Sequence, residues 1–306
     1  MGRKTRIDWA DSSWNPVTGC LHGCQYCYAR RIAERFGLKF APKLGDPGME
    51  GACKYDTEEA GMDTMLELEK PYVSYDGVSN PYPMAFMPTF HKYRLDEPQN
   101  WKKSRTIFVC SMSDLFGEWV PQEWIDQVFK ACEEAPWHTY LFLTKNPKRL
   151  QKMYAEHTLP EHDNWWWGST VTDQNCRRFQ GGLEHTFISI EPIMGPLDAG
   201  LGSFGSAEWI IVGAETANRK DKVVPQKAWI DNITEAAKLT KAAVFMKESL
   251  RDLMGDDFKQ EFPFKEKPTW IRCAAFCPKC GRSLAAEQRL YWPCPCGQRI
   301  DWSDKG

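Results

Sequence analysis

Three cysteines lie within eight residues near the start of the chain, in the stretch Cys20-Leu21-His22-Gly23-Cys24-Gln25-Tyr26-Cys27. The C-x3-C-x2-C spacing places three thiolates on one short loop, where they can ligate three irons of a 4Fe–4S cluster. The fourth iron would keep an open position for a substrate or cosubstrate. A structural zinc site needs a fourth ligand, and the next cysteine along the chain, Cys53, is 26 positions away. A zinc knuckle is the alternative interpretation of this loop. His22, inside the loop, is expected to face solvent.

A second group of cysteines lies in residues 264–306. Its thiols form two pairs separated by 13 residues, Cys277 with Cys280 and Cys294 with Cys296. Two such pairs can build the tetrahedral four-thiolate site of a zinc ribbon, which stabilises a segment too small for its own core. Cys273 extends the first pair to another C-x3-C-x2-C, so an auxiliary iron–sulfur cluster is the competing prediction.

The same C-terminal segment is locally basic and carries aromatic residues: Arg272, Lys279, Arg282, Arg289, Arg299, Trp292 and Trp302. Basic charge combined with exposed aromatic rings is typical of surfaces that contact nucleic acid. A purely structural role for the segment is the alternative.

Composition limits the class of protein. The chain has 306 residues, of which 42% are hydrophobic and 26% charged, as in ordinary globular proteins. The net charge of −2 gives no global electrostatic case for a nucleic-acid binder. No apolar run is long enough to cross a bilayer, so no membrane association is expected. Twelve cysteines in ligand-like spacings, without a signal peptide, favour metal binding in the cytoplasm of a bacterium or a phage-infected host.

Short apolar strands alternate with amphipathic helices along the chain. Strands are predicted at 7–9, 105–110, 139–143, 165–168, 186–190, 209–212 and 243–246, and helices at 28–37, 121–134, 147–155 and 229–239. This alternation indicates parallel βαβ units. We therefore expect an α/β fold, with a full or partial (β/α) TIM-type barrel over residues 1–263 and a small Cys-rich ribbon over 264–306. Residues 38–100, with one helix near 56–70, are expected to form a lid-like insertion at the barrel mouth.

Polar residues follow the predicted strands directly: Ser111, Ser113, Asp114, Lys145, Ser169, Thr170, Glu191, Glu215 and Lys247. The carboxyl ends of parallel barrel strands meet on one rim, where α/β barrels keep their chemistry. We expect these side chains to lie around the cysteine loop. A single Ser or Asp in such a place is often only a helix cap, but a charge directly after an apolar strand needs a partner.

The cysteine spacing, with Tyr26 before the third thiol and Tyr28-Ala29-Arg30 after it, resembles the signature loop of the radical S-adenosylmethionine (SAM) superfamily. In that superfamily the open iron binds the amino and carboxylate groups of SAM. The reduced cluster then cleaves the sulfonium to a 5′-deoxyadenosyl radical, which abstracts a hydrogen atom. The electron comes from a reductant such as flavodoxin or ferredoxin.

A narrower resemblance covers roughly residues 7–263. It rests on Trp14-Asn15-Pro16-Val17-Thr18-Gly19-Cys20, Ser111-Met112-Ser113-Asp114-Leu115-Phe116, Leu143-Thr144-Lys145-Asn146-Pro147, Ser189-Ile190-Glu191-Pro192, Val212-Gly213-Ala214-Glu215 and Lys247-Glu248. These stretches look like a phage- and bacterium-encoded radical-SAM-like family, the phage three-Cys-motif family. The chain is also distantly similar to spore photoproduct lyase, which repairs a thymine dimer in DNA.

The resemblance implies roles by position. Cys20, Cys24 and Cys27 would hold the cluster, and the backbone around Tyr26 would touch the adenine of SAM. Ser111, Ser113 and Asp114 stand where many members have Gly-Gly-Glu against the SAM amino group. Further contacts to SAM and to the reacting group would come from Lys145 near the carboxylate, Ser169 or Thr170 near the ribose, and Glu191, Glu215 and Lys247 on the rim. Cys110 or Cys176 would return a hydrogen atom, although a buried cysteine that packs as a small hydrophobe is the alternative for Cys110.

These inferences predict a radical SAM enzyme that acts on a nucleic acid or nucleotide, in modification or repair. A peptide or small-metabolite substrate is the first alternative. A non-catalytic metal-binding protein that binds nucleic acid, with cysteines that only stabilise structure, is the second.

Overall fold

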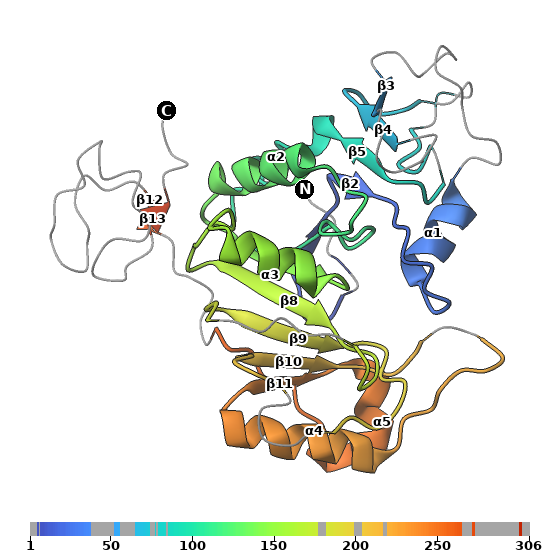
Figure 1. Ribbon diagram of the computed structural model, residues 1–306, viewed down its shortest axis with the longest axis vertical. Helices are drawn as coiled ribbons and strands as arrows, with labels where there is room; N and C mark the ends of the chain where they lie inside the picture. The colour runs from blue at the N-terminus through green and yellow to red at the C-terminus, as the bar shows by residue number, and fades with distance from the viewer. Residues whose placement is uncertain are drawn as a thin grey trace, which may run out of the picture.

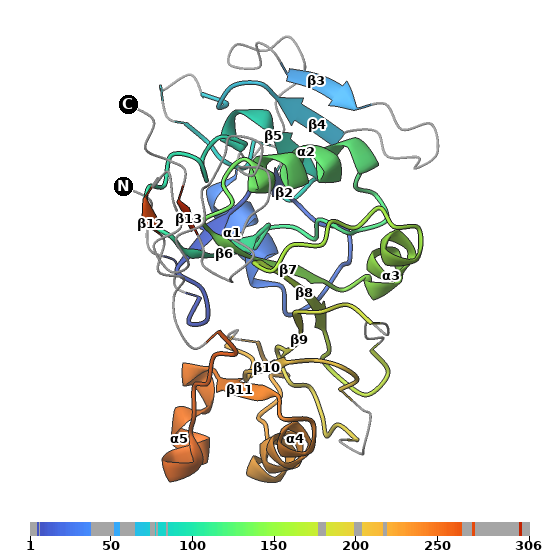
Figure 2. The same cartoon turned by 90° about the vertical axis from the view of Figure 1, so that its left-hand side faces the viewer.

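A computed structural model describes residues 5, 7–37, 52–55, 65–73, 77, 79–83, 85–176, 182–198, 204–216, 219–264, 271–272 and 300–301. Figure 1 shows a curled sheet with helices packed along its outer side, and Figure 2 shows the same arrangement from the side. The expected α/β architecture is confirmed.

Seven parallel strands make the main sheet: β1 (Ser12–Trp14), β6 (Thr106–Val109), β7 (Thr139–Thr144), β8 (Trp165–Thr170), β9 (Thr186–Ile190), β10 (Trp209–Val212) and β11 (Ala243–Met246). They stand in chain order, and every neighbouring pair is parallel. Within the described residues β1 and β11 are edge strands. The sheet is therefore an open half-barrel, and all its carboxyl ends point to one rim.

The helices are α1 (Tyr28–Phe36), α2 (Gln122–Glu133), α3 (Pro147–Ala155), α4 (Lys227–Thr240) and α5 (Arg251–Met254), with 3-10 turns at Lys92–Arg94, Glu248–Leu250 and Gly255–Asp257. On the outer face of the sheet, α2 and α3 bury Trp124, Val128 and Leu150 against β6 to β8. Helix α4 buries Ile230 and Ile233 against β9 to β11 in a second core. These helices fix the outer face, so the inner face is free to form a site.

The inner face of the half-barrel is filled at its lower level by aromatic rings. Trp9, which precedes β1, packs against Phe108 with ring centroids 4.7 Å apart and against Phe187 at 6.2 Å. Gly168 on β8 faces the Phe187 ring, where a Cβ would come within 2.3 Å of it. This close packing forms a closed floor beneath the rim.

A smaller four-stranded sheet has the order β2 (Val17–Thr18), β5 (Thr89–His91), β4 (Met65–Leu68) and β3 (Ala52–Tyr55). The helix predicted near 56–70 is wrong at 65–68, because β4 pairs with both β3 and β5 and is buried throughout. Glu67 on β4 accepts a 2.6 Å hydrogen bond from Trp124 Nε1, which ties the small sheet to α2. The lid-like role of residues 38–100 stays a prediction.

The predicted first strand is also displaced. Residues 8–9 form a turn, and the first strand is Ser12–Trp14, whose Trp14 is fully buried. The strand pairs in parallel with β6, which brings its end directly to the cysteine loop.

Little of the C-terminal segment is described. Ile271–Arg272 (β12) and Ile300–Asp301 (β13) form a short parallel pair. The four cysteines predicted to bind zinc, and Cys273, lie outside the described residues. Among the described helices, none is long and apolar enough to span a bilayer.

Candidate active site

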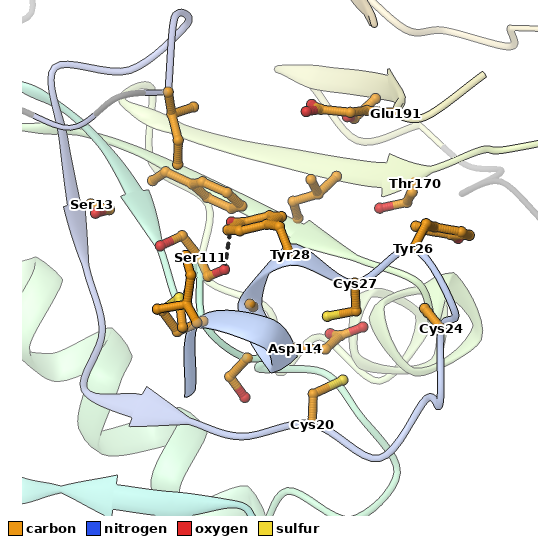
Figure 3. A pocket seen from close by; sticks show the side chains of 18 of the residues that line it. Ser13, Cys20, Cys24, Tyr26, Cys27, Tyr28, Ser111, Asp114, Thr170 and Glu191 are labelled. Carbon is orange, nitrogen blue, oxygen red and sulfur yellow. Dashed lines mark hydrogen bonds between the residues drawn. The ribbon is translucent and has the colours of Figure 1, made fainter. Parts of the chain in front are cut away.

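A pocket of about 550 Å³ opens at the rim, between the cysteine loop and the carboxyl ends of the strands. This volume lies within the range of about 300–1,000 Å³ for small-molecule sites. Figure 3 shows Cys20, Cys24 and Cys27 along the loop, with Thr170 and Glu191 at the ends of strands across from them. The loop and the rim therefore form one site.

Most of the residues predicted from the sequence line this pocket: Cys20, Cys24, Cys27, Tyr26, Ser111, Ser113, Asp114, Lys145, Thr170, Glu191, Glu215 and Lys247. Ser169 does not line it, because it alternates with Thr170 along β8 and shares a face with the outer-core residue Trp167. Neither predicted hydrogen-atom donor lines the pocket.

Backbone contacts fix the start of the cysteine loop. Gly19 has a φ of 85°, and a Cβ there would lie 2.1 Å from the Met87 carbonyl oxygen, so only glycine fits. The Gly19 N–H donates to the Met112 carbonyl at 2.9 Å, and the Cys20 N–H donates to Phe86 at 3.1 Å. The Ser113 hydroxyl donates to the Gly19 carbonyl at 2.6 Å, so its side chain already holds the loop.

The third thiol caps a helix. Cys27 is the N-cap of α1, and its Sγ accepts the Arg30 N–H at 3.3 Å. Burial raises the pKa of the Cys20 thiol to about 12, so a metal that binds this thiol must displace its proton.

His22 lies in the middle of the loop. We expected its side chain to face solvent, but it contacts other side chains instead. Its Nε2 lies 2.7 Å from Asp114 Oδ2, and its ring packs edge-on against Trp119 at 4.8 Å between centroids. The Asp114 carboxylate also accepts the N–H groups of Lys145, at 2.8 Å, and Phe116, at 3.1 Å. Asp114 thus joins the cysteine loop to the ends of β6 and β7.

Lys145 lies over the Tyr26 ring, with Nζ 5.6 Å from its centroid. A cation in this position is attracted by the electron-rich face of the ring. Burial, with a further contribution from Cys24, raises the pKa of the Tyr26 phenol, which stays neutral. The contact places the positive charge that follows β7 beside the loop.

The charges that follow the later strands are paired with one another. Lys247 after β11 binds Glu191 after β9. The path between them crosses Gly213 at the end of β10, where a Cβ would lie 2.8 Å from Lys247 Cδ. Glycine at this position therefore lets the lysine reach across a strand.

Glu215 is connected to the cysteine loop through an arginine. Both of its carboxylate oxygens accept from Arg219, at 3.0 and 3.1 Å, and this pairing lowers the pKa of Glu215. The Arg219 guanidinium also reaches Gln25 Oε1 at 3.4 Å. The loop after β10 thereby contacts the cysteine loop opposite Asp114.

Neither candidate hydrogen-atom donor is among the residues that line the pocket. Cys110 is buried in the outer core, and burial raises its pKa to about 12. Cys176 forms a contact of 3.3 Å with the Thr172 hydroxyl. Their catalytic role stays a prediction.

Several lining residues were not predicted, among them Asn15, Trp9 and Ser189. Asn15 Oδ1 accepts the Met112 N–H at 2.9 Å and the Ser111 hydroxyl at 3.1 Å, which shapes the turn after β6. Trp9 and Ser189 line the deep part of the pocket. Ser189 could have been found from its spacing, because it lies on β9 two residues before Glu191 and alternate residues of a strand share a face.

The three thiols of the cysteine loop could hold either a single metal ion or an iron–sulfur cluster. Among the described residues, no three His, Cys, Asp or Glu side chains converge closely enough for a single metal ion. Thiols that bind different irons of a cluster stand farther apart than the ligands of one ion, so the two cases make different demands on the loop. Three free, half-buried thiols on one loop, facing a common pocket, suit the chemistry of a cluster with one open iron.

Comparison with known proteins identifies one family. The family model described as "Protein of unknown function (DUF5131)" matches residues 4–252. No curated protein and no solved structure matches. The match covers most of the chain, including the cysteine loop and every strand of the half-barrel, and the chain therefore belongs to the DUF5131 family.

Proposed function

We propose that this protein binds a 4Fe–4S cluster on Cys20, Cys24 and Cys27 and cleaves SAM reductively in the adjoining pocket. The observation that carries the proposal is that all three thiols line one pocket together with polar residues from successive strand ends. When bound, the cluster would supply the electron that converts SAM to methionine and a 5′-deoxyadenosyl radical. A reductant such as flavodoxin or ferredoxin would supply that electron to the cluster.

The protein's own residues would position SAM. The Ser111 carbonyl and side chain lie beside the loop, where the Tyr28 hydroxyl donates to the carbonyl at 2.7 Å. Lys145 would stand near the SAM carboxylate, and Thr170 near the ribose. Glu191, Lys247 and Glu215 would hold the opposite rim through their ion pairs.

For the substrate we propose a nucleic acid or nucleotide, to be modified or repaired. This part of the proposal rests on the basic, aromatic C-terminal sequence and on the sequence motifs that we interpret as a distant resemblance to spore photoproduct lyase. The same sequence would hold zinc, or an auxiliary cluster, on Cys277, Cys280, Cys294 and Cys296.

The test is anaerobic reconstitution with iron and sulfide, followed by dithionite and SAM. We expect about four irons at the loop, an absorption band of a cubane cluster, and 5′-deoxyadenosine as a product. A protein that takes up only zinc and leaves SAM intact would refute the proposal.

Cys24→Ala separates the enzyme from the non-catalytic alternative. Its thiol is half-buried at the pocket, so the variant should lose the cluster and SAM cleavage but keep its melting temperature. A structural metal site would lose its fold instead. Cys132→Ala is the matched control, because Cys132 lies in the outer core away from the pocket and should leave iron content unchanged.

A further inference from the structure

Two buried polar groups in the pocket have no hydrogen-bond partner. Trp9 Nε1 and Ser189 Oγ are both unpartnered in the part of the chain that the structure describes. Their residues are only 2% and 1% exposed, and both line the pocket. A buried donor or acceptor without a partner raises the free energy of the folded state. A ligand that hydrogen-bonds to these groups would remove that cost.

Both groups belong to the deep end of the pocket. Trp9 forms part of the aromatic floor, in contact with Phe108 and Phe187. Ser189 follows Phe187 by two residues on the same face of β9 and precedes Glu191 on the rim. Trp9 therefore belongs to the aromatic floor, and Ser189 lies between that floor and the charged rim.

The walls at this depth are apolar and aromatic. Phe108, Leu143 and Ile7 line the pocket and pack in the same cluster as Trp9. An indole N–H can only donate, whereas a serine hydroxyl can donate and accept. Together they match a flat ring whose edge carries an acceptor and a second polar atom.

Among the described residues that line the pocket, an ionic group would find no free counter-charge beside Trp9 and Ser189. Lys145 lies over the Tyr26 ring at the cysteine loop, where the proposed function places the SAM carboxylate, and Lys247 is paired with Glu191. Arg31, another cation that lines the pocket, is exposed on α1. The part of a ligand that reaches the floor is therefore uncharged, because burying an unpaired charge is far more costly than burying a hydrogen-bonded neutral group.

We infer that Trp9 Nε1 and Ser189 Oγ form a subsite for the neutral, hydrogen-bonding edge of a nucleobase in the substrate. This inference deepens the proposed function and rests on it for the reaction that follows binding. Trp9 Nε1 would donate to a carbonyl oxygen or ring nitrogen, and the Ser189 hydroxyl would complete the pair. Phe108 and Leu143 would cover the faces and edges of the ring.

The test follows the Trp9 indole directly. The full-length protein, as purified, is labelled with ¹⁵N at its tryptophan indoles, and the Trp9 signal is identified by its absence in Trp9→Phe. Uridine, thymidine, cytidine and guanosine are then titrated to millimolar concentration in the presence of S-adenosylhomocysteine, which fills the place of SAM. We expect a saturable shift of the Trp9 signal with at least one nucleoside. The Trp209 indole, which donates to the Glu261 carbonyl in the same aromatic cluster, should not move.

Ser189→Ala is the second variant. It keeps Trp9, so the Trp9 signal can still be followed during the titration. It should weaken nucleoside binding about fivefold, the effect of one lost neutral hydrogen bond, without lowering the melting temperature. Thr186→Val is its control on the same strand. The Thr186 hydroxyl already donates to the Ser206 carbonyl at 3.1 Å, so this variant should lower the melting temperature and leave binding unchanged.

Several results would overturn the inference. One is a Trp9 signal that no nucleoside moves, and another is a shift that Ser189→Ala leaves equally strong. A shift produced by S-adenosylhomocysteine, with no further change on adding nucleosides, would assign the subsite to the adenine of SAM instead. Nucleoside binding in a protein that never cleaves SAM would refute the proposed function alone, whereas SAM cleavage with a silent Trp9 would refute this inference alone.

Discussion

His22 Nε2 and Asp114 Oδ2 lie 2.7 Å apart, although the two residues are 92 positions apart in the chain. One belongs to the loop that carries the three thiols, and the other follows β6 on the rim. Asp114 is 4% exposed and holds two backbone N–H groups besides. The contact therefore makes the position of the loop depend on the rim of the half-barrel.

His22→Ala should lower the iron retained per protein after reconstitution, because the middle of the loop loses its contact with Asp114. His22→Gln should restore part of it, since an amide can still donate to the carboxylate. Iron and sulfide content after gel filtration is the measurement. Equal iron content in the wild type and both variants would show that this contact does not position the thiols.

Asp114→Ala should lower the free energy of unfolding by about 2–3 kcal/mol, because the N–H groups of Lys145 and Phe116 lose their acceptor in a buried turn. Urea denaturation measures the change. Asp221→Ala is the control, since Asp221 is exposed and its loss should change stability by less than about 0.5 kcal/mol. A loss for Asp114→Ala no larger than that of the control would contradict the assigned role.

Gly168→Ala should destabilise the protein by about 1–3 kcal/mol through overpacking. The added Cβ would lie 2.3 Å from the Phe187 ring, which is enclosed by Trp9 and Trp209 and has no room to withdraw. Gly195→Ala serves as the comparison, because no atom lies within 4 Å of a Cβ there. The measurement is the melting temperature of each variant in thermal unfolding. Equal melting temperatures for the two variants would argue against a closed floor.

His91 should make the protein less stable in mild acid. Its side chain is fully buried, with Nε2 2.8 Å from the Thr18 hydroxyl, and burial lowers the pKa of the imidazole well below its usual 6.5. Above that value both the folded and unfolded states hold neutral histidine. Below it only the unfolded chain takes up the proton, so stability falls by up to about 1.4 kcal/mol per pH unit as the pH drops.

His91→Gln removes this titration, so its free energy of unfolding should depend less steeply on pH below 6.5 than that of the wild type. Urea denaturation at a series of pH values measures both slopes. His157→Gln, at an exposed position, should keep the slope of the wild type. Identical slopes for His91→Gln and the wild type would mean that His91 takes up its proton equally in the folded and unfolded states.

Local patterns in the sequence predicted much of the fold. The alternation of buried strands such as 139–143 with amphipathic helices such as 121–134 indicated the parallel half-barrel, because each element must bury one face against the next. The polar residues after the strands, among them Asp114, Glu191 and Lys247, were placed correctly on one rim for the same reason. The strand at 65–68 was missed, since short apolar runs do not distinguish helix from strand without their pairing partners.

The sequence by itself determined that three thiols share one loop and that charged residues follow apolar strands. Only the tertiary structure decided which of these residues meet. His22 finds Asp114, and Lys247 crosses Gly213 to reach Glu191, because separate strands end at the same rim. From the sequence pattern alone, Trp9 and Ser189 look like ordinary core residues. Their unpartnered polar atoms are found only when the curl of the sheet brings Trp9 and Ser189 to one pocket.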